Sequence, residues 1–286
     1  MGSVLAEKRL RTAVEQALRG AGMELKQVRE GRWDFSFKNG SVQTGLALCT
    51  EEWLHLSAPA PKAVLERDGR LPETQWALLE ANGLLSGGIR YGIAPDASVR
   101  LYADVPLRPE TAAVQEAVAR ACKGFRAAHR VSSSRAETPD ETADETVSPA
   151  ELCRAAGWAP EVRASGECAV ALETPRMRWQ GLFSAEAPWR VWTSVPVAVR
   201  PDSVGGGALA RLLLEASRLF CMVRPVWRGA GELEFEAFLG AHPSSDDVHW
   251  ALSALSTGMG LCGGVVSAFS DEAIANAYLR CAVARR

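Results

Sequence analysis

Apolar and polar residues follow each other in the first half of the chain in a pattern that predicts helices packed on antiparallel strands. Helical spacing predicts helices over 5–20, 71–85 and 110–130. Alternation predicts strands over 32–38, 42–49, 53–58, 89–93 and 98–105. The dipeptide Asn39-Gly40 predicts a tight hairpin between the first two strands. The predicted order is α-β-β-β-α-β-β-α, with the helices on one side of the sheet.

The same pattern occurs again about 135 positions later, which indicates a duplication. Leu78-Leu79-Glu80-Ala81 returns as Leu213-Leu214-Glu215-Ala216. The offset holds to within one residue elsewhere: Leu101 corresponds to Phe235, and the strand around Trp192 aligns so that Trp192 corresponds to Leu56. A constant offset across both halves predicts two copies of one structural unit.

The predicted domains are a first copy over 1–130, a linker over 131–149 and a diverged second copy over 150–286. The linker holds five acidic residues, one basic residue and almost no large apolar residue. Such a segment cannot bury enough surface to order itself, so we expect it to be disordered. An acidic start and a basic end over 271–286 predict an extra C-terminal helix.

Composition narrows the range of partners. A length of 286 residues suits two ordinary domains, and a net charge of −2 disfavours nucleic acid and anionic membranes. The first 25 residues lack the apolar core of a secretion signal, and the longest apolar run, 258–269, is too short to cross a bilayer. We therefore expect a cytoplasmic protein that does not contact membranes.

Motifs for chemistry are weak throughout the chain. Seven cysteines without a Cys-x-x-Cys pair indicate buried free thiols, and four scattered histidines do not form a metal set. His249 follows Asp246 by three residues, but Ser244 with Asp247 is typical of a helix start. The run Gly205-Gly206-Gly207 lacks the lysine of a phosphate loop and is interpreted as a flexible connector. The sequence thus predicts no catalytic, metal-binding or cofactor-binding residue, although an enzyme with an unrecognised site stays open.

One aromatic group stands out in the second half. Trp179, Trp189, Trp192 and Trp227 gather in the predicted sheet, and Arg190 lies beside two of them. These five residues are the candidate partner-binding site, because aromatic and arginine side chains bind peptides or single-stranded nucleic acid. Core packing of the tryptophans is the simpler alternative. Trp189 and Trp192 fall on opposite faces of one strand, so at least one of them points away from the core or lies under a helix.

Residues 78–107 carry a family resemblance. A Leu-Leu-Glu-Ala-Asn helix leads into the Gly87-Gly88 hairpin and the strand Val-Arg-Leu-Tyr-Ala-Asp-Val-Pro-Leu. This arrangement resembles the type III secretion chaperone-like fold, including YbjN-type proteins. The resemblance implies a non-catalytic α+β domain whose relatives pair as homodimers and bind an extended segment of another protein.

Together these patterns predict an α+β fold of two tandem repeats and a protein-binding role, chaperone-like or adaptor, without a catalytic step. The second copy would replace the partner subunit in an intramolecular pseudo-dimer, through the helices over 71–85 and 208–220 or through the closing helices. The expected partner is another protein or a peptide segment, and the chain is either a monomer with pseudo-two-fold halves or a dimer. The alternative function is a ligand- or nucleotide-sensing regulatory module that uses the Trp/Arg surface.

Overall fold

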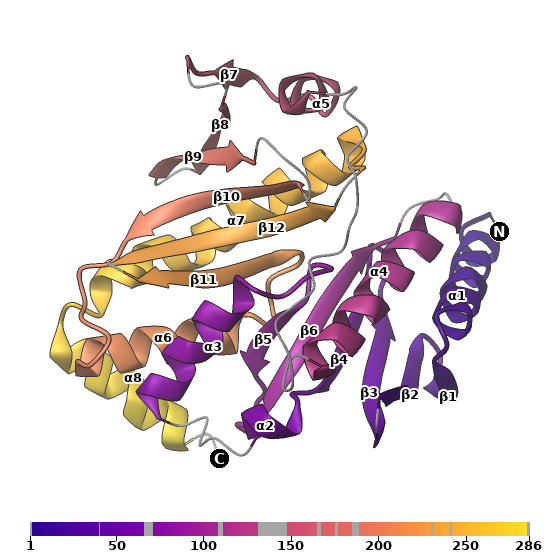
Figure 1. The fold of residues 1–286 in the computed structure, drawn as a ribbon, viewed down its shortest axis with the longest axis horizontal. Helices are drawn as coiled ribbons and strands as arrows, with labels where there is room; N and C mark the ends of the chain where they lie inside the picture. The colour runs from indigo at the N-terminus through magenta and orange to yellow at the C-terminus, as the bar shows by residue number, and fades with distance from the viewer. Residues whose placement is uncertain are drawn as a thin grey trace.

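A computed structural model shows an α+β protein with two six-stranded antiparallel sheets (Figure 1). The structure describes residues 2–39, 41–65, 71–107, 111–130, 148–164, 167–174, 177–184, 189–229, 231–240 and 242–284. The predicted linker lies outside the described residues except for its last two positions, and so does Gly40 of the predicted hairpin turn.

The first repeat, residues 2–130, contains four described helices and six strands. The helices are α1 (Gly2–Gly20), α2 (Lys62–Leu65), α3 (Pro72–Asn82) and α4 (Thr111–Arg130). The strands are β1 (Glu24–Arg29), β2 (Arg32–Asn39), β3 (Ser41–Cys49), β4 (Trp53–Pro59), β5 (Arg90–Ile93) and β6 (Val99–Pro106). They pair in the order β1-β2-β3-β4-β6-β5.

The second repeat, residues 148–284, reproduces this order strand for strand as β7-β8-β9-β10-β12-β11. Its helices are α5 (Pro149–Ala155), α6 (Val204–Ala216), α7 (Ser245–Ala268) and α8 (Glu272–Ala284). Its strands are β7 (Pro160–Val162), β8 (Cys168–Thr174), β9 (Met177–Phe183), β10 (Trp189–Pro196), β11 (Val223–Gly229) and β12 (Glu232–Gly240). The predicted duplication of architecture is confirmed, and α8 is the predicted extra helix.

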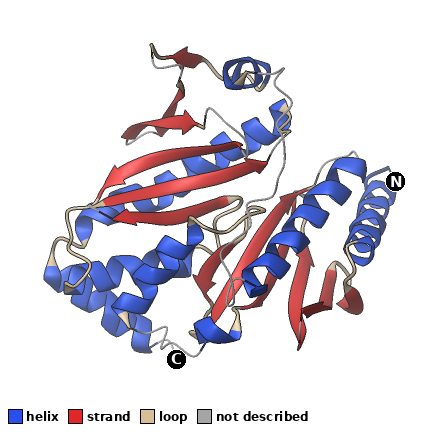
Figure 2. Cartoon of the chain, in the orientation of Figure 1, coloured by secondary structure: helices blue, strands red, loops and turns tan. Residues whose placement is uncertain are grey.

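Each sheet has an inner face that forms the core of its repeat. In the first repeat, Leu56 and Leu101 lie on this face, and in the second, Val191 and Phe235 lie there. The helices α1 and α4 cover the inner face of the first sheet, and α5 and α7 cover that of the second (Figure 2). Every second residue of β4 and β6 is buried, which is the predicted alternation. Among the described helices, α7 alone is long and apolar enough to suit a membrane; here it packs along the second sheet with Leu255 buried.

Two edge strands were missed by the sequence pattern. β1 pairs with β2 and β7 with β8, so each repeat has four strands before its central helix and not three. Nearly every residue of β1 is exposed, and β7 is only three residues long. A strand that is exposed on both faces has no apolar alternation to recognise.

The predicted alignment of the strand around Trp192 was wrong by one residue. Leu56 pairs with Ala103, and Val191 pairs with the corresponding Ala237 of the second repeat, so Val191 is the counterpart of Leu56. A β-bulge at the first step of β10 absorbs the extra residue. Trp192, which follows Val191, therefore lies on the opposite, outer face of the second sheet.

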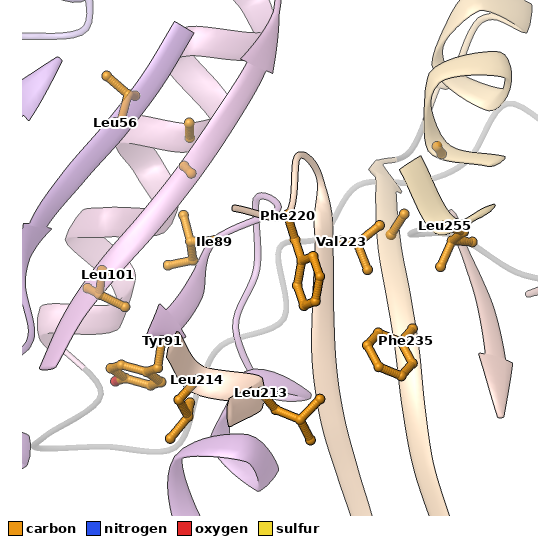
Figure 3. Packing of buried hydrophobic residues seen from close by; sticks show 14 of the residues in the cluster. Leu56, Ile89, Tyr91, Leu101, Leu213, Leu214, Phe220, Val223, Phe235 and Leu255 are labelled. Carbon is orange, nitrogen blue, oxygen red and sulfur yellow. The ribbon is translucent and has the colours of Figure 1, made fainter. Parts of the chain in front are cut away.

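The central helices α3 and α6 break the prediction that all helices lie on one side. They pack against each other, α3 also packs on β11 of the other repeat, and α6 packs on β5 (Figure 1). Figure 3 shows this region, with Leu213 and Leu214 of α6 next to the strand β5. The two repeats therefore cover each other's outer faces at this edge of each sheet.

We expect Leu79→Ala in α3 to lower the free energy of unfolding by about 2–5 kcal/mol, because Leu79 is fully buried where the repeats meet and its loss leaves a cavity. Urea denaturation followed by circular dichroism measures this. Leu84→Ala is the matched control, since Leu84 is 74% exposed and its truncation should change stability by less than about 0.5 kcal/mol. Equal effects of the two substitutions would contradict the packing described.

Candidate functional site

Arg90 is the most deeply buried charged residue in the described part of the first repeat. β5 directs it to the outer face, where its side chain is 1% exposed. Its Nε donates to the carbonyl oxygen of Ser217, 2.6 Å away, and its Nη2 donates to the carbonyl oxygen of Phe220. These carbonyls lie at and beyond the C-terminal end of α6, where backbone oxygens lack helical partners and the helix dipole is negative. The guanidinium thus caps a helix of the other repeat.

Asp104 of β6 balances this buried charge. Its carboxylate accepts a hydrogen bond from Arg90, and the Nδ1 of His55 lies 2.6 Å from its other oxygen. Burial opposes ionisation of Asp104, but Arg90 and the hydrogen bond from His55 outweigh it, so the pKa of Asp104 lies below its usual value. The carboxylate is therefore charged at neutral pH and holds Arg90 in place.

Arg224 of β11 makes the reciprocal contact. It occupies the position that corresponds to Arg90, and its Nη1 donates to the carbonyl oxygens of Leu85, at 2.5 Å, and Ile89, at 3.4 Å. Leu85 and Phe220 are 135 positions apart and follow the corresponding helices. Each repeat thus inserts an arginine into the backbone that follows the other repeat's central helix, which is an isologous contact about a pseudo-two-fold axis.

The carboxylate partner differs in the second repeat. Glu236 of β12 is 1% exposed and pairs with Arg224. It also pairs with Arg190 and with Arg228, and the nitrogen–oxygen distance is 2.9 Å in both of these pairs. Burial opposes its ionisation, but the nearby arginines, Arg224 first, hold the pKa of Glu236 below its usual value. Glu234 accepts from Arg228 at 2.6 Å. Three arginines and two glutamates therefore form one connected network on the outer face of the second sheet.

The two buried pairs specify geometry more than they add stability. Arg90 Nη1 and Arg224 Nε are buried without a hydrogen-bond partner, so part of the cost of dehydrating each guanidinium is not recovered. Buried ion pairs of this kind are strongly destabilising when one partner is removed. The two buried ion pairs therefore restrict the repeats to one relative arrangement.

Aromatic contacts also join the two repeats. The rings of Trp76 and Trp227 lie 4.5 Å apart, and Trp76 Nε1 donates to the carbonyl oxygen of Pro201 at 3.2 Å. At another point of contact Trp53 of β4 meets Trp250 of α7, with ring centroids 5.3 Å apart. Residues from α3, β4, α7 and β11 thus join the two repeats well beyond the central helices.

The five candidate partner-binding residues separate into three environments. Trp189 and Trp227 are buried, at 8% and 7% exposure, and Trp227 is part of the contact between the repeats. Trp179 is half-buried on the inner face, and its indole nitrogen has no hydrogen-bond partner. Arg190 and Trp192 remain on the outer face, where the guanidinium carbon lies 4.7 Å from the ring centroid of Trp192. The structure brings together only these last two as a partly exposed pair.

The run Gly205-Gly206-Gly207 is not a flexible connector. It forms the first turn of α6, capped by Ser203, and a Cβ at Gly205 or Gly206 would lie about 2 Å from the carbonyl oxygen of Phe269 or Arg200. Close backbone packing requires glycine here. The predicted helix start at Ser244 and Asp247 is confirmed as a capping box.

His55 and Asp104 have the geometry of a base and its orienting acid, and Cys221 lies near Asp104. Burial raises the pKa of Cys221 to about 11, so the thiol stays protonated and is a poor nucleophile.

No group of three or more histidine, cysteine or acidic side chains that could hold a metal occurs in the described part of the chain.

Comparisons with protein-family models, characterised proteins and solved structures find no significant match. The sequence reasoning missed Arg90, Asp104, Arg224 and Glu236. One signal was present: Arg90 and Arg224 are charged residues at corresponding positions of apolar strands.

Asp104→Asn should lower the free energy of unfolding at pH 7 by about 3–5 kcal/mol, because it leaves the buried guanidinium of Arg90 without its counter-charge. Urea denaturation provides the measurement. Asp34→Asn removes an exposed carboxylate from the same sheet and serves as control, with an expected change under about 0.5 kcal/mol. A small effect at Asp104 would show that the buried pair does not hold the repeats.

Stability should also fall in acid. Asp104 and Glu236 have lowered pKa values in the folded state, so their contribution is present above the unfolded carboxyl values of about 4 and is lost as the pH falls through the lower folded values. Urea denaturation between pH 6 and pH 3 should show this decline. The decline should be shallower in Asp104→Asn, and an unchanged slope in that variant would contradict the assignment.

Proposed function

We propose that this chain is a non-enzymatic protein-binding protein, chaperone-like or adaptor in role, that acts as an intramolecular pseudo-dimer in the cytoplasm. The observation that supports it is the reciprocal contact between the repeats: α3 on β11, α6 on β5, and Arg90 and Arg224 each bound to backbone of the other repeat. The chaperone-like domains that the sequence resembles pair as homodimers. Here the second repeat takes the place of the second subunit.

The outer face of the second sheet is the surface proposed for the partner. Trp192 pairs across the sheet with Leu182, and Arg190 pairs with Phe238, so three large apolar side chains and one arginine lie together. All four are partly exposed. Aromatic and arginine side chains around a partly apolar surface suit an extended protein segment, in which side chains alternate between the sheet and solvent.

The pairing of Arg190 favours a protein partner over the alternative, a ligand- or nucleotide-sensing module. Its guanidinium already binds Glu236 and stacks on Trp192, so it offers little free charge to a phosphate. Trp192 with Leu182 and Phe238 offers apolar contact, which a peptide uses better than a nucleotide. A thermal-shift screen with metabolites and oligonucleotides separates the two functions, because stabilisation by a small ligand would support the alternative.

Peptides selected from a random display library on the full chain should bind wild-type protein and lose at least about tenfold in affinity with Trp192→Ala, because an aromatic anchor carries a large share of peptide affinity. Fluorescence anisotropy measures the change. Leu261→Ala, an exposed leucine on α7, is the control and should leave affinity unchanged.

If no peptide is enriched, or if the selected peptides bind Trp192→Ala as well as wild type, the outer face of the second sheet is not the binding surface.

A further inference from the structure

Gly92 allows α6 to lie directly on the first sheet. A Cβ at this position of β5 would lie 2.9 Å from the backbone carbonyl oxygen of Leu214 and 2.9 Å from the ring of Tyr102. Backbone cannot move aside as a flexible side chain can, so any larger residue here would push α6 away from the strand.

Gly83 makes room for the second repeat in the opposite direction. It follows α3, and a Cβ there would lie 2.6 Å from Arg228 Nη1 and 2.9 Å from Val226 Cγ1. The side chains of β11 thus occupy the space that a side chain at position 83 would need. Both close approaches depend on glycines of the first repeat.

The corresponding positions of the second repeat are large. Val226 corresponds to Gly92 and Arg218 corresponds to Gly83. If two second repeats paired in the geometry seen here, Val226 would meet the backbone of α6 at Leu214, and Arg218 would meet Val226 and the like charge of Arg228. Two-fold symmetry would impose each clash twice.

Pairing of two first repeats fails for the opposite reason. Gly83 would face a strand without the bulk of Val226, because Gly92 stands at that position. Trp76 would lose the ring of Trp227, whose counterpart is Ile93. Such a pair would contain unfilled space, and cavities in a buried interface are costly.

We infer that this surface pairs only unlike repeats: the first repeat binds the second repeat, and neither repeat binds a second copy of itself. If two whole chains dimerise through this face, the dimer must be domain-swapped, with the first repeat of each chain paired with the second repeat of the other. This inference rests on the pseudo-dimer of the proposed function and does not depend on the identity of the bound partner. Its specificity-determining residues are Gly83, Gly92, Arg218 and Val226.

The test uses the full chain with a protease recognition sequence placed within 131–147. The protein is cut after folding, isotope-labelled and unlabelled samples are mixed in urea, and the fragments are refolded together by dilution. Native mass spectrometry should show pairs of one first and one second repeat, with labels exchanged at random. Homotypic pairs above about a tenth of the total would overturn the inference.

Failure of the fragments to associate at all would overturn both the inference and the pseudo-dimer, whereas homotypic pairs would overturn the inference alone.

Gly92→Val supplies a second measurement, since it places in the first repeat the residue that the second repeat has at the corresponding position, Val226. It should weaken association of the cut halves at least about 100-fold. Gly20→Ala is the control, because a Cβ there meets nothing within 4 Å. Unchanged association in Gly92→Val would count against the inference.

Discussion

Two buried guanidinium groups determine how the halves of this protein can meet. Arg90 and Arg224 lose their hydration when the repeats close, and each recovers it only from backbone carbonyls of the other repeat and from one acid of its own sheet. An arginine without these partners would be a buried, uncompensated charge. This requirement constrains how α3, α6, β5 and β11 can be placed relative to one another.

The duplication gives the two repeats a pseudo-two-fold arrangement, but the residues around the two buried arginines have diverged. Asp104 and Glu236 both neutralise an arginine, but Glu236 lies directly across from Arg224, whereas Asp104 lies two residues beyond the residue opposite Arg90. His55 completes the first network, and Arg190, its counterpart after the bulge, completes the second. Fusion of the repeats lets each side change independently, which a homodimer cannot do.

Several elements could be predicted because their signals are local. The strands β4 and β6 alternate between buried and exposed residues, and the helix start at Ser244 depends on its neighbour three residues later. Other features had no local signal. β1 is exposed on both faces, the bulge in β10 is visible only from its pairing with β12, and Gly205 at the start of α6 is required by the backbone oxygen of Phe269, which belongs to a distant segment.

The sequence by itself determined the repeat, the order of most elements and the presence of tryptophan and arginine in the second sheet, since periodicity and offset are properties of neighbouring residues. Only the tertiary structure decided which of these side chains are covered. Trp227 is buried because Trp76, 151 positions earlier, packs against it, and Arg90 is a cap because Ser217 arrives from the other repeat. Contacts over such separations depend on how the chain folds back, which no local pattern encodes.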